Sequence, residues 1–204
     1  MAAGADPSRG GKGISAYSAA KVYGNQPRAA MMPEAPLSKE ETLLAQAATG
    51  RVPDGVFIDP AKIPPIYLDL VFEFAGTPEK LDHLKALIKI GMPWDRPNPF
   101  GLPPVQIAGW QGQPEMLGYF LSLSPNLGHI NGYGGTLLST IIHGSENNPE
   151  RAGRDYVGCL ELALIKVVAL PKRAIKFAGN AKVKSFLQDW AEKHPGQVVE
   201  HGIA

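Results

Sequence analysis

Four glycines recur at a nearly constant interval in this sequence. Gly76, Gly112, Gly144 and Gly179 lie 36, 32 and 35 residues apart. Each stands between two short runs with apolar residues at helical spacing, so each predicts the turn of a helix pair. Isolated helices shorter than about 12–15 residues are marginal in water, and these runs are no longer than that. The helix pairs must therefore stack on one another to bury their apolar faces.

The clearest pair occupies residues 101–121. Pro103 and Pro104 stand where its first helix begins, a position that tolerates the fixed φ and missing N–H of proline. Gly112 marks the turn, and Pro114 opens the second helix. Apolar residues then recur at i, i+3 and i+4, and these are Leu117, Phe120 and Leu121.

The same pattern predicts three further pairs. We expect their first and second helices at 66–75 and 78–90, at 136–143 and 155–168, and at 173–178 and 181–192. In the third pair of the series the turn is predicted at Gly144–Ser145, followed by an insertion. Before these pairs, a helix over 37–48 is predicted, because Ser38 and Glu41 have the spacing of a capping box.

These elements divide the chain into four segments. Residues 1–36 are rich in Ala, Gly, Ser and Pro and are predicted to form an extended or disordered N-terminal arm. Residues 37–65 are predicted as a capping helix and a proline-rich connection, and residues 66–192 as the repeat domain. Residues 193–204 are left as a polar C-terminal tail.

The repeats resemble those of the ankyrin family. Gly101-Leu-Pro-Pro-Val-Gln-Ile-Ala108 matches the family pattern G-x-T-P-L-H-x-A in its Gly, second Pro and Ala, with Gln106 at the position of the His. Gly134-Gly-Thr-Leu-Leu138 keeps the Gly and the Thr. The resemblance implies an all-α fold, a short solenoid of helix-turn-helix repeats with a concave face that binds other proteins. It implies neither a cofactor nor an active site.

Composition limits how this protein can bind other molecules and where it can work. The formal net charge of +1 gives no general attraction to nucleic acid, and the longest apolar run is far shorter than the roughly 20 residues of a membrane span. Cys159 is the single cysteine, which excludes an intrachain disulfide and fits a reducing compartment inside the cell. We expect the cytoplasm, with the mitochondrion as the alternative because the N-terminal composition also suits a transit peptide.

Five residues are predicted to contact a partner. Trp94, Phe100 and Tyr133 lie at predicted loop tips among prolines and glycines, where an aromatic ring is exposed and can anchor an interface. Arg96 and Asn131 lie beside them. The prediction is a non-enzymatic protein–protein interaction module, an accessory or assembly subunit of a larger complex. It would bind its protein partner through the N-terminal arm and the loop face, with no small-molecule substrate and no specific nucleic acid.

Two other functions are left open. Ser139 and His143 stand at i and i+4 of one predicted helix, with Asp155 further along, which is compatible with a small hydrolase. The arm and the basic last repeat could instead bind an anionic surface, either nucleic acid or membrane. The five histidines have no metal-ligand spacing, so no metal site is predicted.

Overall fold

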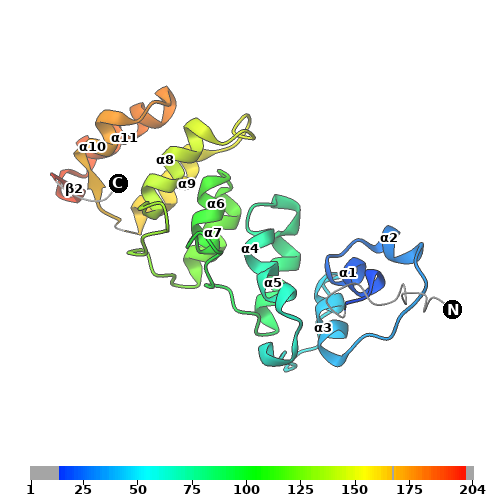
Figure 1. The fold of residues 1–204 in the computed structure, drawn as a ribbon. Helices are drawn as coiled ribbons and strands as arrows, with labels where there is room; N and C mark the ends of the chain where they lie inside the picture. Colours follow the sequence, from blue (N-terminus) through cyan, green and yellow to red (C-terminus); the bar gives the residue numbers. More distant parts are fainter. Residues whose placement is uncertain (1–13, 167, 201–204) are drawn as a thin grey trace. The chain divides into compact units, whose positions relative to one another are not determined.

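The computed structural model describes residues 14–166 and 168–200, and this part of the chain is mostly helical (Figure 1). The predicted all-α class is confirmed. The chain forms two compact units, each described by itself below. The first contains residues 14–74 with Glu79–Trp94, and the second contains Ala75–Pro78 with residues 95–200. The first predicted helix pair therefore clusters with the N-terminal segment rather than with the later pairs.

The elements up to residue 89 are short helices with irregular connections. In chain order they are α1 (Ala16–Val22), α2 (Gln26–Ala30), α3 (Lys39–Ala47), η1 (Pro60–Lys62), η2 (Pro65–Asp69), α4 (Leu70–Phe74), η3 (Pro78–Lys80) and α5 (Leu81–Lys89). The helix predicted over 66–75 thus begins as a 3₁₀ turn, and so does the helix predicted over 78–90.

The predicted arm is not extended over its described part. Helix α1 packs against α3 and α2, and Val22 is fully buried. Small side chains allow this close packing, so α1 needs few large apolar residues to be held. Ser18 is also buried, and its hydroxyl contacts the carboxylate of Glu41 and, at 3.0 Å, the hydroxyl of Tyr67. Residues 1–13 of the predicted arm lie outside the described residues.

Helix α3 begins as the sequence predicts. The amide of Glu41 donates to Ser38 Oγ at 3.0 Å, and the amide of Ser38 donates to Glu41 Oε2 at 2.9 Å. This reciprocal pair satisfies two backbone donors that the first turn of a helix otherwise leaves unpaired. The second oxygen of the same carboxylate is the one that Ser18 contacts. The cap of α3 therefore also holds α1.

The remaining elements form the second unit. They are α6 (Pro104–Trp110), α7 (Pro114–Ser122), α8 (Leu137–Asn147), α9 (Tyr156–Ile165), β1 (Leu170–Pro171), α10 (Lys172–Phe177), α11 (Ala181–Lys193), η4 (Pro195–Gln197) and β2 (Val198–Val199). The predicted polar tail is docked over its described part, because β2 pairs in parallel with β1.

Like helices of successive pairs are neighbours in this unit. Helices α6 and α7 form one pair and α8 and α9 the next, with α6 against α8 and α7 against α9 (Figure 1). The buried side chains between them include Leu117, Phe120 and Leu137, each at most 1% exposed. Burying a side chain of this size contributes roughly 1.5–3 kcal/mol. The stacking that the short helices require is thus present for these two pairs.

Two of the predicted turns differ in outcome. Gly112 lies between α6 and α7 with a φ of +61°, a conformation that favours glycine. Gly144 was predicted as a turn, but α8 continues past it to Asn147. A Cβ at Gly144 would lie 2.5 Å from the carbonyl oxygen of Trp110. This glycine is therefore needed for the close approach of α8 to the end of α6, and the turn prediction was wrong.

At three places in the second unit, a side-chain amide donates to a backbone carbonyl about one repeat earlier in the chain. Gln113 Nε2 donates to the carbonyl of Gly76. Asn148 Nδ2 donates to the carbonyl of Trp110 at 2.9 Å, and Asn180 Nδ2 to that of Ser145 at 3.2 Å. These partners are 37, 38 and 35 residues apart in sequence. The hydrogen bonds therefore repeat with nearly the period of the glycines.

Replacing Asn148 tests the contribution of such a bond. Asn148 is 2% exposed and also donates to Gln111 Oε1 at 2.9 Å. Asn148→Ala removes two hydrogen bonds to half-buried acceptors, although the Trp110 carbonyl keeps one from the Tyr156 hydroxyl. At about 0.5–1.5 kcal/mol for each lost bond, we expect the free energy of unfolding to fall by about 1–3 kcal/mol. The neighbouring Asn147 is exposed, and Asn147→Ala should change it by less than about 0.5 kcal/mol. Urea denaturation measures both, and equal effects would contradict the assignment.

His83 is an unusual buried residue of the first unit. It is 7% exposed, and its ring centroid lies 4.8 Å from that of Phe74. Among the described residues, neither ring nitrogen has a hydrogen-bond partner. Burial, together with the nearby charge of Lys80, lowers the pKa of His83 from 6.5 to about 4. The folded protein therefore holds this imidazole neutral.

Stability should depend on pH through this side chain. Between pH 6.5 and about 4, the unfolded chain binds a proton at His83 that the folded chain does not, so stability falls as the pH falls. The expected loss is about 3 kcal/mol. His83→Leu should remove this component from the curve of unfolding free energy against pH. His143→Leu, at an exposed histidine, should leave this component in place. Parallel curves for His83→Leu and wild type would exclude the effect.

Candidate functional site

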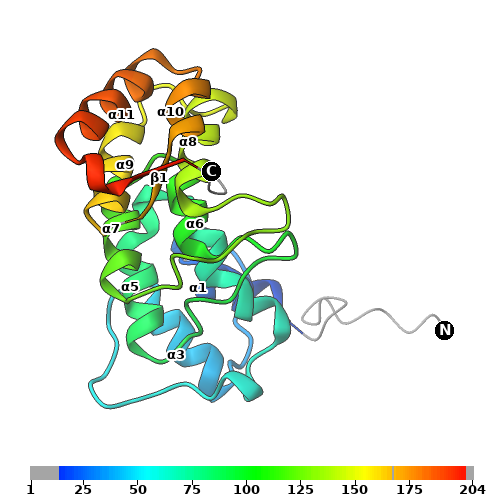
Figure 2. The ribbon, with the colours of Figure 1, turned by 90° about the vertical axis from the view of Figure 1, so that its left-hand side faces the viewer.

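Two aromatic rings are exposed side by side in the second unit. Phe100 is 59% exposed and Tyr133 is 73% exposed. Their ring centroids lie 5.9 Å apart with an interplanar angle of 21°, so the rings are stacked. Phe100 comes from the loop before α6 and Tyr133 from the loop before α8, and Figure 2 shows these loops running side by side. Two of the predicted partner-binding residues are thus brought together.

Glycines allow the two loops to touch through their backbones. The amide of Gly132 donates to the carbonyl of Phe100 at 2.9 Å. A Cβ at Gly132 would lie 2.5 Å from that carbonyl oxygen, and one at Gly101 would lie 2.9 Å from the amide nitrogen of Gly132. Gly101 also has a φ of +73°. The aromatic pair therefore stands on a backbone junction that admits no larger residue at either position.

Asn131 has a structural role, which differs from its predicted contact with a partner. It is 6% exposed, and its Nδ2 donates to Gln106 Oε1 at 2.8 Å and to Thr140 Oγ1 at 3.2 Å. Its Oδ1 accepts from the amides of Tyr133 at 2.9 Å and Gly135 at 3.1 Å. Its position near a loop tip suggested exposure, but all of these partners turn the side chain inward. Asn131 shapes the loop that carries Tyr133.

Gln106 braces the same loop from α6. It is 1% exposed, and its Nε2 donates to the carbonyl of His129 at 3.0 Å while its Oε1 accepts from Asn131. The His129 ring in turn lies 2.6 Å, through Nε2, from the carbonyl of Gly101. The two loops are thus bonded to each other, and the loop before α8 is also bonded to α6. The aromatic pair is held in a prearranged position.

The other two predicted contact residues belong to different units. Trp94 is half-buried and belongs to the first unit, whereas Arg96 is exposed in the second. Their roles as partner contacts stay predictions.

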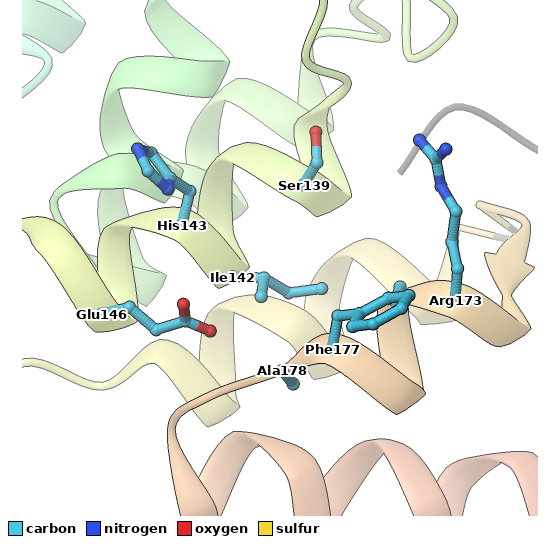
Figure 3. Close-up of a pocket in the computed structure, with 8 residues that line it drawn as sticks. Ser139, Ile142, His143, Glu146, Arg173, Phe177 and Ala178 are labelled. Carbon is cyan, nitrogen blue, oxygen red and sulfur yellow. The ribbon is translucent and has the colours of Figure 1, made fainter.

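The predicted hydrolase residues do not form a catalytic arrangement. Ser139 Oγ accepts from the amide of Thr136 at 2.8 Å, as part of the cap of α8. His143 Nδ1 lies 2.9 Å from the side-chain Nδ2 of Asn147. The carboxylate of Asp155 accepts from the backbone at the start of α9. Figure 3 shows the side chains of Ser139 and His143 pointing in different directions. Each of the three residues therefore has a hydrogen-bond partner outside this trio.

Cys159 does not offer a thiolate nucleophile. Its side chain is fully buried in α9, and burial is the main reason that its pKa is raised to about 12. A thiol with this pKa is almost entirely protonated at neutral pH, and the thiolate is the reactive form.

A shallow groove between α8 and α10 was missed by the sequence analysis. It has a volume of about 280 Å³ and is shown in Figure 3. Its lining residues are Ser139, Ile142, His143, Glu146, Arg173, Ala174, Phe177 and Ala178. The available signal was Phe177, a large apolar residue that follows three basic residues in a six-residue helix.

The part of the chain that the structure describes contains no group of three or more His, Cys, Asp or Glu side chains placed to hold a metal ion.

No helix in residues 14–166 or 168–200 has the length and apolar character needed to cross a membrane.

The junction under the aromatic pair can be tested by substitution. Gly132→Ala places a Cβ against the carbonyl of Phe100, so we expect the two loops to separate and chymotrypsin to cleave faster after Phe100 and Tyr133. Gly128→Ala lies in the same loop, where the nearest contact of a Cβ would be Asn126 Oδ1 at 3.4 Å, and should cleave at the wild-type rate. Wild-type cleavage of Gly132→Ala would show that the loops do not depend on this contact.

Comparisons with known proteins give no family. No family model matches the sequence, and no curated protein matches it. Among solved structures, the chain is similar to one chain of a complex between a predatory endopeptidase of Bdellovibrio bacteriovorus and an immunity protein. The TM-score is 0.43 at 18% sequence identity, and the match covers 60% of this chain and 64% of that one. At this level the likeness assigns neither a fold nor a partner to this chain.

Proposed function

We propose that this chain is a non-enzymatic protein-interaction module, an accessory or assembly subunit that binds another protein through the stacked rings of Phe100 and Tyr133. The observation that carries the proposal is the exposure of both rings, 59% and 73%, on loops that are bonded to each other. Two large rings exposed to water do not stabilise the free protein. A partner that covers them gains their full apolar area.

The fixed position of the pair favours binding over a chance exposure. Aromatic residues are enriched among the residues that dominate interface energies, because a large ring loses little conformational entropy when it is buried. Here the supporting loops are held by Gly132, Asn131 and Gln106 before any partner arrives. Ordering that is already present in the free protein does not have to be supplied on binding.

We also propose that the helix pairs form an ankyrin-like solenoid. Contacts between like helices of successive pairs support this, and so do the three amide bonds from Gln113, Asn148 and Asn180. In such a stack the loops between pairs lie along one face, which suits an extended binding surface. Gln106, at the position of the family's His, braces the following loop.

The proposed binding surface does not include the described part of the arm. Helix α1 is committed to packing on α3, with Ser18 and Val22 buried, so it is not a free segment that could lie on a partner. Residues 1–13 lie outside the described residues. The loops of the second unit are therefore the proposed contact.

The test compares the pair with another exposed aromatic residue. The double variant Phe100→Ala and Tyr133→Ala should lose partner proteins from a native extract that wild type retains, as quantified by mass spectrometry. With a purified partner, calorimetry should show at least about tenfold weaker binding. Phe57→Ala removes a ring that is 69% exposed in the first unit and should bind as wild type does. Equal retention by the double variant would contradict the proposal.

A further inference from the structure

We propose that the groove between α8 and α10 is a second binding site, for a peptide segment of a partner protein in which an acidic residue lies next to a large apolar side chain. The site is separate from the aromatic pair and does not depend on the function proposed for that pair. It is assigned from four features of the groove: its size, its apolar surface, the bonds that fix its shape and the sign of its charge.

The groove is small and open, and it has room for an apolar side chain. Its volume of about 280 Å³ is just below the roughly 300–1,000 Å³ of sites that bury small molecules. Ile142, Ala174 and Ala178 lie in it with low exposure, and Phe177 forms a wall that is 72% exposed. Figure 3 shows Ile142 and Phe177 facing each other between the two helices. An apolar side chain placed between them would cover the Phe177 ring.

Two hydrogen bonds hold the helices that form the groove. Glu146 Oε1 accepts from the amide of Gly179 at 2.7 Å, just beyond the end of α10. Asn180 Nδ2 donates to the carbonyl of Ser145 on α8 at 3.2 Å. The groove therefore has its shape before a ligand binds. The carboxylate of Glu146, which lines the groove, is already engaged by this contact.

Helix α10, which forms one wall of the groove, is positively charged, whereas α8 on the other side carries the carboxylate of Glu146. Helix α10 carries Lys172, Arg173 and Lys176 and has no acidic residue. Lys172 pairs with Glu200, and Lys176 Nζ lies 5.2 Å from the centroid of the Phe177 ring. Arg173 lines the groove and is exposed, and among the described residues it forms no ion pair. A carboxylate next to the inserted apolar side chain could pair with its guanidinium in two parallel hydrogen bonds.

This combination favours a peptide over other anionic partners. A membrane surface or a nucleic acid would meet the charge of α10 but would leave a concave apolar groove of side-chain size unused. An acidic peptide with a bulky apolar residue uses both. Apolar side chains inserted into a groove between helices, with charges at its edge, are a common mode of peptide recognition.

A displayed library of random peptides tests the site. We expect selection on the full chain to enrich peptides with Asp or Glu beside a large apolar residue. Fluorescence anisotropy of the best peptide should show that Phe177→Ala and Arg173→Gln each bind it at least about tenfold more weakly than wild type does. Both residues are exposed, so the variants should keep the wild-type Tm. Lys182→Gln removes an exposed charge outside the groove, and it and the Phe100/Tyr133 double variant should bind as wild type does.

Several results would overturn the proposal. One is a selection that enriches no peptide, or that enriches the same peptides on Phe177→Ala. Another is an equal loss of affinity in Arg173→Gln and Lys182→Gln, which would indicate a diffuse charge effect. A third is a DNA oligonucleotide or a phosphatidylserine vesicle that displaces the peptide from wild type and from Phe177→Ala alike. This last result would assign α10 to an anionic surface.

Discussion

One polar interaction recurs through the second unit beside its apolar core, the hydrogen bond from a side-chain amide to a backbone carbonyl about one repeat earlier in the chain. Gln113, Asn148 and Asn180 each make it. The first helix of a short pair ends in a turn where carbonyl groups have no partner within the helix. If the next pair buries that turn, a carbonyl that finds no other donor destabilises the folded state. The amide supplies the donor and, because its reach is short, also sets where the next pair lies.

The loop surface follows from that position. Once α6 and α8 are neighbours, Gln106 reaches the loop before α8, and Asn131 bonds back to Gln106. The two loops then meet at Gly132, and the rings of Phe100 and Tyr133 stack above the junction. The buried polar groups thus organise the loops, while the exposed rings remain available. Asn131, which its position suggested as a contact residue, is one of the buried polar residues that organise the loops.

Local signals in the sequence predicted elements well where a backbone rule decides the outcome. The capping residue Ser38 and the turn at Gly112 are such cases, and both are confirmed. The errors arose where packing decides. Helix α1 lacks large apolar residues, yet its small ones are what permit close packing on α3. Gly144 is a residue type typical of turns, but the close approach of the Trp110 carbonyl explains the need for a glycine inside α8. The groove beside Phe177 joins residues from two helices, and no single stretch of sequence carries that information.

Helix α8 connects the aromatic pair with the groove. The loop carrying Tyr133 leads into its N-terminal cap, and four of its residues line the groove, namely Ser139, Ile142, His143 and Glu146. Eleven helical residues span about 16 Å, a distance that an extended peptide covers in roughly five residues. One partner could therefore place an aromatic contact on the loops and an acidic segment in the groove. Two contacts at the two ends of α8 raise the effective concentration of the second once the first has formed, so modest affinity at each would suffice for stable binding.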